Sequence, residues 1–521
     1  MNASRHPAPP IIALVCFLMT SMHPAFAQLI DAGANHTVYR CTDGTLWGVG
    51  EGGNGQLGDG QFVNHTAPVQ ATGITNVRMV SGGQAHTLVL GDDGLVRVTG
   101  RNVEGQLGNA GINFQLTYSI LPGHTDVKAI SCGRVHSLIL KNDGTVWAFG
   151  SNTNGQLGTG NTTNSNVPVQ IPGLSDIIAI SAGRIHSLFL KSDGTVWACG
   201  SNNFGQVGNT PLNPAVDPVQ ISGLSDIKAI DAGDNHSLFL HREGFVLACG
   251  YNQSGQLGNG NTQSTGTVVS VNGMNDVIAL GARGNHSLFL KSDGTAWGCG
   301  ANAEGQLGDG TNTNRTTPVQ VQGISDVVAL AAGGNHSIFL RNDGTLWACG
   351  WNVIGQLGDG TTTTRNTVAQ VNTPCIICYH TYASLSVTAC NSYTTPSGNA
   401  TYTTSGIYED IIPNAMGCDS ITVIDLQILE ADLTLTTEEG SITVGQTAAS
   451  YQWLDCGAGN IAIEEAIDQD YSPTTSGTYA VEVTVDGCTT TSACVLFCLP
   501  ATSAMSVTAC GSYTTPSGSA T

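Results

Sequence analysis

Charge is scarce in this 521-residue sequence, and basic charge is the scarcest. Only 11% of the residues are charged, and 17 lysines and arginines stand against 38 aspartates and glutamates, so the formal net charge is -21. Affinity for nucleic acids comes largely from basic side chains that neutralise phosphates. The composition therefore argues against a nucleic-acid partner. Together with the 67 glycines, it is typical of an extracellular all-β protein.

Long apolar runs are missing as well. The run at 11–19 is too short to span a bilayer, and no later stretch approaches the required length. Arg5 precedes this run and Ala25-Phe26-Ala27 follows it, so residues 1–27 are predicted to be a secretory signal peptide. We therefore expect a secreted or cell-surface protein without a transmembrane segment, in which cysteines are free to form disulfides.

Motifs of catalysis are also absent. The sequence has no Gly-x-Ser-x-Gly elbow, no phosphate-binding loop and no His-Glu-x-x-His helix. Loops 308–313 and 358–363 carry oxygens that suit calcium, but they lack the carboxylate spacing and final glutamate of a calcium loop. We interpret them as turns, and we predict no enzyme activity, no cofactor and no metal site.

What the sequence does have is a 50-residue repeat. A histidine recurs seven times at this spacing, in step with a Gly-Gln-Leu/Val-Gly stop, and seven repeats occupy residues 28–372. The histidines are His36, His86, His136, His186, His236, His286 and His336. Catalysis needs one asymmetric constellation, so a histidine present in every repeat is predicted to be structural. Its expected role is hydrogen bonding to backbone groups of a neighbouring strand.

Each repeat contains about four short strands and no helical period. Residues 286–291 and 295–300 alternate around Ser292-Asp293-Gly294, which predicts a hairpin, and strands are expected at 276–282 and 318–321. Both faces of the hairpin are apolar, so neighbouring repeats must cover them. Seven copies that close radially leave no face uncovered, which favours a propeller. A linear solenoid is the alternative, and it would need distinct caps.

The motifs Ala-Gly-x-x-His-Ser-Leu-x-Leu, Asp-Gly-Thr-x-Trp and Gly-x-Asn-x-x-Gly-Gln-Leu-Gly resemble the repeat of the regulator of chromosome condensation family. This resemblance implies a seven-bladed β-propeller. Arg97 and Leu247 at the tryptophan position, and Arg283 before His286, are interpreted as drift. The family's founding member is an exchange factor for a nuclear GTPase, but that activity is not carried over, because the shared motif is the blade scaffold. Secreted propellers that resemble this repeat include protein inhibitors of β-lactamase, which implies a protein-binding disc.

Four cysteines share one position in successive repeats. They are Cys199, Cys249, Cys299 and Cys349. Equivalent positions in neighbouring blades usually lie farther apart than a disulfide permits. We therefore predict that these cysteines pack as small apolar groups.

Positions at which the seven copies differ are candidates for binding. The residue after each Cys-Gly or its equivalent, and the residue before each Gly-Gln, should cluster on one face. Large apolar residues there are candidate anchors, with drift as the alternative. Repeat two also carries an apolar segment that forms either an altered outer strand or an edge for a partner. The candidate binding residues are Phe204, Tyr251, Trp351, Ile354, Phe114 and Tyr118.

A different composition begins at residue 373. We predict a linker at 373–383, a small disulfide-bridged β module at 384–430, an immunoglobulin-like β-sandwich module at 431–496, and the truncated start of another module at 497–521. The last assignment follows from residues 505–521, which repeat 385–401. Such a tail resembles those of modular bacterial surface proteins.

The cysteines of the tail are expected to form disulfides. A Cys390–Cys418 bridge is predicted, and Cys456 is expected to pair with Cys488 or with Cys494. The pairing of Cys375, Cys378, Cys494 and Cys498 stays open.

The leading hypothesis is a monomeric propeller, secreted or displayed on the cell surface, that binds an extracellular protein or glycan, with the tail as a stalk. One alternative is an extracellular enzyme with its site at the propeller axis. Another is a structural component of a surface layer or an adhesin.

Overall fold

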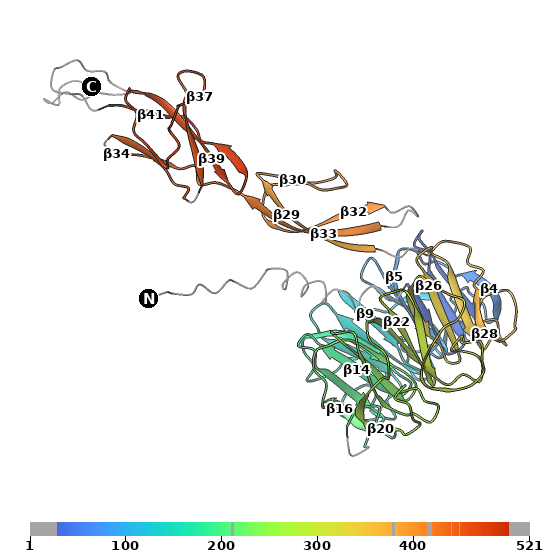
Figure 1. The fold of residues 1–521 in the computed structure, drawn as a ribbon. Coiled ribbons are helices and arrows are strands. Elements are labelled where there is room, and N and C mark those ends of the chain that lie inside the picture. Colours follow the sequence, from blue (N-terminus) through green and yellow to red (C-terminus); the bar gives the residue numbers. More distant parts are fainter. Residues whose placement is uncertain are drawn as a thin grey trace, which may run out of the picture. The chain divides into compact units, whose positions relative to one another are not determined.

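The computed structural model describes residues 29–209, 213–377, 381–413, 419–438, 440–447 and 449–499 (Figure 1). The predicted signal peptide, Cys378, Cys418 and almost all of the predicted last module lie outside these residues. The chain divides into two compact units, Met1–Tyr379 and His380–Thr521. No helix among the described residues is long and apolar enough to cross a membrane.

The first unit consists of seven four-stranded antiparallel sheets, each built from one repeat. We number these blades in chain order. Blade 1 holds β1 (Ile30–Ala32), β2 (His36–Arg40), β3 (Leu46–Gly50) and β4 (His65–Gln70); blade 2 holds β5 (Val77–Gly82), β6 (His86–Gly91), β7 (Val96–Arg101) and β8 (Phe114–Ile120); blade 3 holds β9 (Val127–Cys132), β10 (His136–Lys141), β11 (Val146–Gly150) and β12 (Ser165–Gln170). Blade 4 holds β13 (Ile177–Ala182), β14 (His186–Lys191), β15 (Val196–Gly200) and β16 (Ala215–Gln220); blade 5 holds β17 (Ile227–Ala232), β18 (His236–His241), β19 (Val246–Gly250) and β20 (Thr265–Ser270). Blade 6 holds β21 (Val277–Arg283), β22 (His286–Lys291), β23 (Ala296–Gly300) and β24 (Arg315–Gln320); blade 7 holds β25 (Val327–Ala332), β26 (His336–Arg341), β27 (Leu346–Gly350) and β28 (Arg365–Gln370).

Local sequence explains the blade. In blade 6, β22 and β23 pair across Ser292-Asp293-Gly294, as predicted, and Gly294 has a φ of 78°, which favours glycine. The Asp293 carboxylate accepts hydrogen bonds from the backbone N–H and the hydroxyl of Thr295, so the Asp-Gly-Thr sequence builds its own turn. The closing strand β24 is longer than the sequence suggested, because it begins at Arg315.

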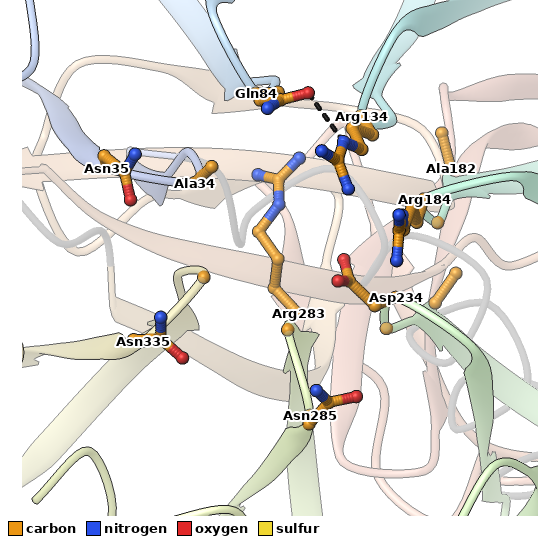
Figure 2. A pocket seen from close by; sticks show the side chains of 15 residues that line it. Ala34, Asn35, Gln84, Arg134, Ala182, Arg184, Asp234, Arg283, Asn285 and Asn335 are labelled. Atoms are coloured by element: carbon orange, nitrogen blue, oxygen red, sulfur yellow. Dashed lines mark hydrogen bonds between the residues drawn. The ribbon is translucent and has the colours of Figure 1, made fainter. Parts of the chain in front are cut away.

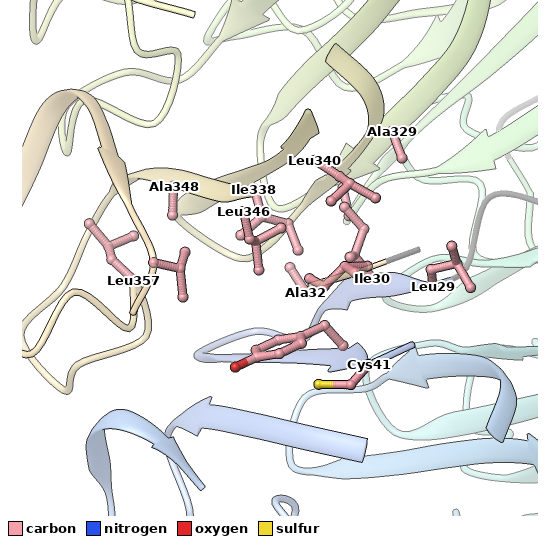
Figure 3. Close-up of a cluster of buried hydrophobic side chains, with 14 residues drawn as sticks. Leu29, Ile30, Ala32, Cys41, Ala329, Ile338, Leu340, Leu346, Ala348 and Leu357 are labelled. Carbon is pink, nitrogen blue, oxygen red and sulfur yellow. The ribbon is translucent and has the colours of Figure 1, made fainter. Parts of the chain in front are cut away.

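The core lies between blades, which is why both faces of each sheet are apolar. Leu288 and Leu290 of blade 6 pack with Phe339 and Cys349 of blade 7, and equivalent clusters fill the other junctions. The junction of blades 7 and 1 has the same kind of core, in which Ile30 of β1 packs with Ile338 and Leu340 of β26 (Figure 3). The predicted ring is therefore closed, and the linear solenoid is excluded.

Ring closure does not depend on a strand shared between the two ends. Blade 1 and blade 7 are each made of one continuous segment. Across their junction, the hydroxyl of Thr42 donates a hydrogen bond to the carbonyl of Ile376, and a disulfide joins Cys41 to Cys375. This disulfide, which spans 334 residues, covalently links the first blade to the segment after the last one.

The described residues of the second unit form small β-sheets. The strand β33 (Asp419–Leu429) lies between β29 (Thr381–Cys390), which is parallel to it, and β32 (Gly406–Pro413), which is antiparallel. The strands β30 (Tyr393–Thr394) and β31 (Thr401–Tyr402) form a hairpin. Two further sheets follow: β34 (Leu435–Glu438), β35 (Ser441–Val444) and β38 (Asp470–Tyr471) form one, and β36 (Ser450–Asp455), β37 (Ile461–Ala462), β39 (Gly477–Val485), β40 (Cys488–Thr491) and β41 (Val495–Phe497) form the other. Trp453, Tyr479 and Phe497 fill the core of these last two sheets.

Disulfides in the tail differ from the predicted ones. Cys390 pairs with Cys488, so the expected Cys390–Cys418 and Cys456–Cys488 bridges are both wrong. The physical reason is that Cys390 ends β29 and Cys488 begins β40, which brings their Cα atoms to 5.4 Å. Cys456 pairs with Cys494, the alternative left open by the sequence. Cys498 is also disulfide-bonded.

Candidate functional site

One end of the propeller gathers the segments in which the repeats differ most. In each blade, the turn between the first two strands lies beside the long connection between the last two strands. Backbone hydrogen bonds join them: the N–H of Tyr251 donates to the carbonyl of Asn235, and the N–H of Trp351 donates to the carbonyl of Asn335. We call this surface the loop face. It comprises residues 33–35 and 51–64 of blade 1 and the equivalent residues of the other blades.

The predicted aromatic anchors lie on the loop face in two groups. The rings of Phe204 and Tyr251 form an edge-to-face pair across the junction of blades 4 and 5, with centroids 4.8 Å apart. Trp351 and Ile354 belong to the same loop of blade 7, and both are half-buried. Phe204 is 36% exposed, so the first pair combines a partly accessible ring with a fixed neighbour, as binding anchors do.

The apolar segment of repeat two forms an outer strand. β8 pairs with β7, and Tyr118 packs against the core between blades 1 and 2. Packing removes Tyr118 from the candidate binding face. Phe114, at the start of the same strand, is 43% exposed and contacts the ring of Phe62, which is also exposed. These two phenylalanines form a third apolar site on the rim of the loop face.

The recurrent histidines connect each blade to the next one. In every junction the imidazole Nε2 lies 2.9 to 3.1 Å from a serine or threonine hydroxyl of the following blade. That hydroxyl donates to the carbonyl of a glutamine in the histidine's own blade, as Ser337 does to Gln306. The hydroxyl must then accept from the imidazole, so Nε2 carries the proton. Burial lowers the pKa of His36, His136, His236 and His336 to about 3, which keeps the rings neutral.

Carboxylates in the axial channel are also bonded to neighbouring blades. Asp31 accepts from the backbone N–H of Gly82, and Asp231 accepts from that of Ala282. Both are half-buried, and desolvation raises the pKa of Asp231 to about 6. Each carboxylate links two adjacent blades, and both line the same cavity of about 200 Å³ in the channel.

Arg283 has a specific position at the axis. It extends from blade 6 across the channel and donates to the backbone carbonyls of Ala32, Gly82 and Cys132, which belong to blades 1, 2 and 3. The arginine lines both a cavity of about 290 Å³ on the loop face (Figure 2) and a second cavity of about 200 Å³ in the channel. Sequence reasoning interpreted Arg283 as drift, and the structure corrects this.

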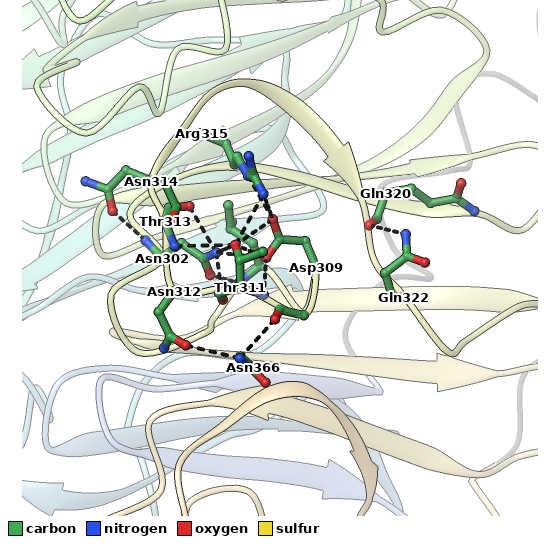
Figure 4. A network of polar contacts seen from close by, with 12 residues as sticks. Asn302, Asp309, Thr311, Asn312, Thr313, Asn314, Arg315, Gln320, Gln322 and Asn366 are labelled. Atoms are coloured by element: carbon green, nitrogen blue, oxygen red, sulfur yellow. Dashed lines mark hydrogen bonds and ion pairs between the residues drawn. The ribbon is translucent and has the colours of Figure 1, made fainter.

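The suspected calcium loops are built from protein hydrogen bonds. Asp309 accepts from the hydroxyl and backbone N–H of Thr311, from the side-chain amide of Asn302 and from Arg315 (Figure 4). Its oxygens are thereby occupied by donors of the chain itself. Among the described residues, no cluster of histidine, cysteine, aspartate or glutamate could hold a metal ion.

Five buried cysteines without a disulfide lie in the propeller: Cys132, Cys199, Cys249, Cys299 and Cys349. Burial raises the pKa of each thiol, so little reactive thiolate is present. We expect iodoacetamide at pH 8 to leave all five unmodified in the native chain and to alkylate all five in denaturant, as measured by peptide mass mapping. Alkylation of any one in the native chain would contradict this packing.

Comparisons with known proteins agree with this architecture. A model of the RCC1-like domain matches residues 117–406, and models of the regulator of chromosome condensation (RCC1) repeat match residues 43–90 and 28–56. The first match covers more than half of the sequence, and the chain belongs to the RCC1-like domain family. Propellers of this family are typically protein-binding scaffolds and usually not enzymes. A search of curated proteins found no match.

Solved structures show the same fold. Yeast RCC1 (Prp20) bound to Kap60 has a TM-score of 0.58 at 19% identity, and the match covers 72% of this chain and 90% of that one. Prp20p from Saccharomyces cerevisiae, described with its binding to Gsp1p and histones, has a TM-score of 0.57 at 21% identity, with 68% and 89% covered. Human WBSCR16 has a TM-score of 0.54 at 23% identity, with 60% and 86% covered.

Proposed function

We propose that this chain is an exported, monomeric propeller that binds a partner protein through its loop face. The observation that carries the proposal is the Phe204–Tyr251 pair, which places a partly exposed aromatic group beside a second ring on the face where the repeats differ. Aromatic side chains dominate the energetic centres of protein interfaces. Trp351 and Ile354 on blade 7, and Phe62 with Phe114 on the rim, supply further apolar contacts.

Export is supported by the sequence of residues 1–27 and by the disulfides. The Cys41–Cys375, Cys390–Cys488 and Cys456–Cys494 bridges need an oxidising compartment to form and persist. We propose that the second unit, with two of these bridges, acts as a stalk that carries the propeller.

The test compares wild-type chain with the double variant Phe204→Ala/Tyr251→Ala in capture from the extracellular fraction of the source cells. A specific partner should be lost from the variant by at least about tenfold, the usual consequence of removing an interface centre. Ile120→Ala is the matched control, because Ile120 is exposed at the opposite end of the outer strand β8. Equal capture by all three chains would refute the proposed face.

A further inference from the structure

The cavity on the loop face of the axial channel is where seven turns converge. We call this cavity the axial mouth; it is lined by residue 34 and its equivalents, by Asn35, Asn285 and Asn335, and by Arg283. Its volume is about 290 Å³. The position equivalent to Ala34 is occupied by Gln84, Arg134, Arg184 and Asp234 in blades 2 to 5. The lining of the mouth is therefore polar, and its charge differs from one side to the other (Figure 2).

Basic charge is concentrated here against the trend of the whole chain. Three of only 17 lysines and arginines line the mouth, namely Arg134, Arg184 and Arg283, and they face a single aspartate, Asp234. In a protein with a formal net charge of -21, this is a local reversal of sign. A cationic recess with low-dielectric walls focuses its potential outward and attracts anions.

The guanidinium groups differ in what they already bind. Arg283 donates to three backbone carbonyls and forms the floor of the mouth. Arg134 donates from Nε to Gln84, at 2.7 Å, which fixes the direction of its side chain. The ion pairs within the described residues lie elsewhere, so neither Arg134 nor Arg184 is paired with a carboxylate.

Arg134 and Arg184 also repel each other, and this repulsion favours an anion in the mouth. Burial and the neighbouring Arg184 lower the pKa of Arg134. Burial also raises the pKa of Asp234, and Arg184 opposes that shift, so the aspartate is close enough to reduce the positive potential without removing it. An anion between Arg134 and Arg184 would relieve their repulsion.

We propose that the axial mouth is a binding site for a carboxylate group, held by Arg134 and Arg184. Planar guanidinium groups match a planar carboxylate with paired hydrogen bonds. The volume is that of roughly ten water molecules, which suits an acidic side chain or a chain terminus and excludes a folded element. A small free carboxylate and an acidic residue of a partner protein have the same chemistry. The second source rests on the proposed function, whereas the first does not.

The experiment is calorimetric titration of the full chain at low salt with three probes: glutarate, an amidated Gly-Glu-Glu-Glu-Gly peptide, and phosphate. We expect glutarate or the peptide to bind, and Arg134→Gln/Arg184→Gln to weaken that binding by about tenfold or more. Asp234→Asn should strengthen it by about threefold, because one repelling charge is lost. This gain cannot come from misfolding. Tighter binding of glutarate would identify a free ligand as the source, and tighter binding of the peptide would identify a partner residue.

The matched control is Arg101→Gln. Arg101 lies on the same loop face, and its variant loses one positive charge where the double variant loses two. Arg101 is paired with Glu104 at 2.8 Å and lies outside the mouth. Its variant should bind the probes within about twofold of wild type. The proposal is overturned if neither carboxylate probe binds, if phosphate binds more tightly than both, or if Arg101→Gln weakens binding as much as the double variant. Loss of partner capture in Phe204→Ala/Tyr251→Ala would still stand in each of these cases, so the two proposals fail separately.

Discussion

Acidification from pH 7 to pH 5 is expected to lower the free energy of unfolding of the propeller steeply. Seven imidazoles are fully buried in its blade junctions, each with Nε2 bonded to a hydroxyl. Burial lowers the pKa of His186 and His286 to about 4 and that of His36 to about 3. The unfolded chain, in which histidine titrates near its ordinary value of about 6.5, therefore binds protons that the folded chain refuses.

The direction of the pH effect follows from this difference in pKa between the folded and the unfolded chain. Above about pH 6.5 both states are neutral at these residues, and the stability is fully present; below it, the unfolded state gains protons and stability falls until the folded-state pKa values are reached. Burial raises the pKa of Asp31, Asp231 and Asp234 in the folded state, which opposes the effect by up to three protons. A net uptake of about four to six protons at pH 5 corresponds to roughly 5–8 kcal/mol per pH unit.

The free energy of unfolding can be measured by urea unfolding, followed by tryptophan fluorescence, at several pH values between 7.5 and 5. The slope of this free energy against pH gives the proton uptake. His286→Gln should reduce the uptake by about one proton. The tail is an internal control, because the sequence has no histidine after His380; hydrogen exchange of its peptides, corrected for the intrinsic rate, should show no matching loss of protection. An uptake of about one proton or none would contradict neutral buried imidazoles.

Much of the blade could be predicted from the sequence, because each unit encodes its own hairpin locally. Asp293 and Gly294 determine a turn within a few residues, and the apolar faces of the flanking strands require neighbours. The hydroxyl partner of the histidine could also have been found. Every repeat has a serine or threonine directly after the histidine, from Thr37 to Ser337, but its meaning depends on the next blade.

The contacts at the axis could not be predicted in this way. Arg283 replaces one glycine, and only ring closure places it opposite the carbonyls of Ala32, Gly82 and Cys132. Arg134 and Arg184 are 50 residues apart in sequence, and the turn that precedes each histidine was not among the variable positions considered. Pairing of Cys390 with Cys488 likewise depends on which strand ends meet, and spacing alone does not determine that.

Closure of the ring has a physical consequence for stability. Each internal junction of the propeller has a peptide connection between its two blades, but the junction of blades 7 and 1 has none. Apolar packing around Ile30 and Ile338, the His336 to Thr37 hydrogen bond and the Cys41–Cys375 disulfide hold it instead. Opening of the junction between blades 7 and 1 would expose two apolar sheet faces at once. We therefore infer that the main effect of the disulfide is to keep this junction closed.

Removal of this disulfide by Cys41→Ser/Cys375→Ser is expected to cost about 3–5 kcal/mol, because the bridge closes a very long loop in the unfolded chain. For a unit of this size, that corresponds to a fall in the melting temperature of the propeller of about 4–7 °C. Scanning calorimetry measures the shift. Hydrogen exchange should locate the lost protection in β1, β2 and β25–β28, and should leave blades 3 to 5 nearly unchanged. Cys456→Ser/Cys494→Ser is the matched control, since that bridge lies in the second unit; it should leave the propeller transition in place. A melting temperature for Cys41→Ser/Cys375→Ser within about 1 °C of wild type would show that packing alone closes the ring.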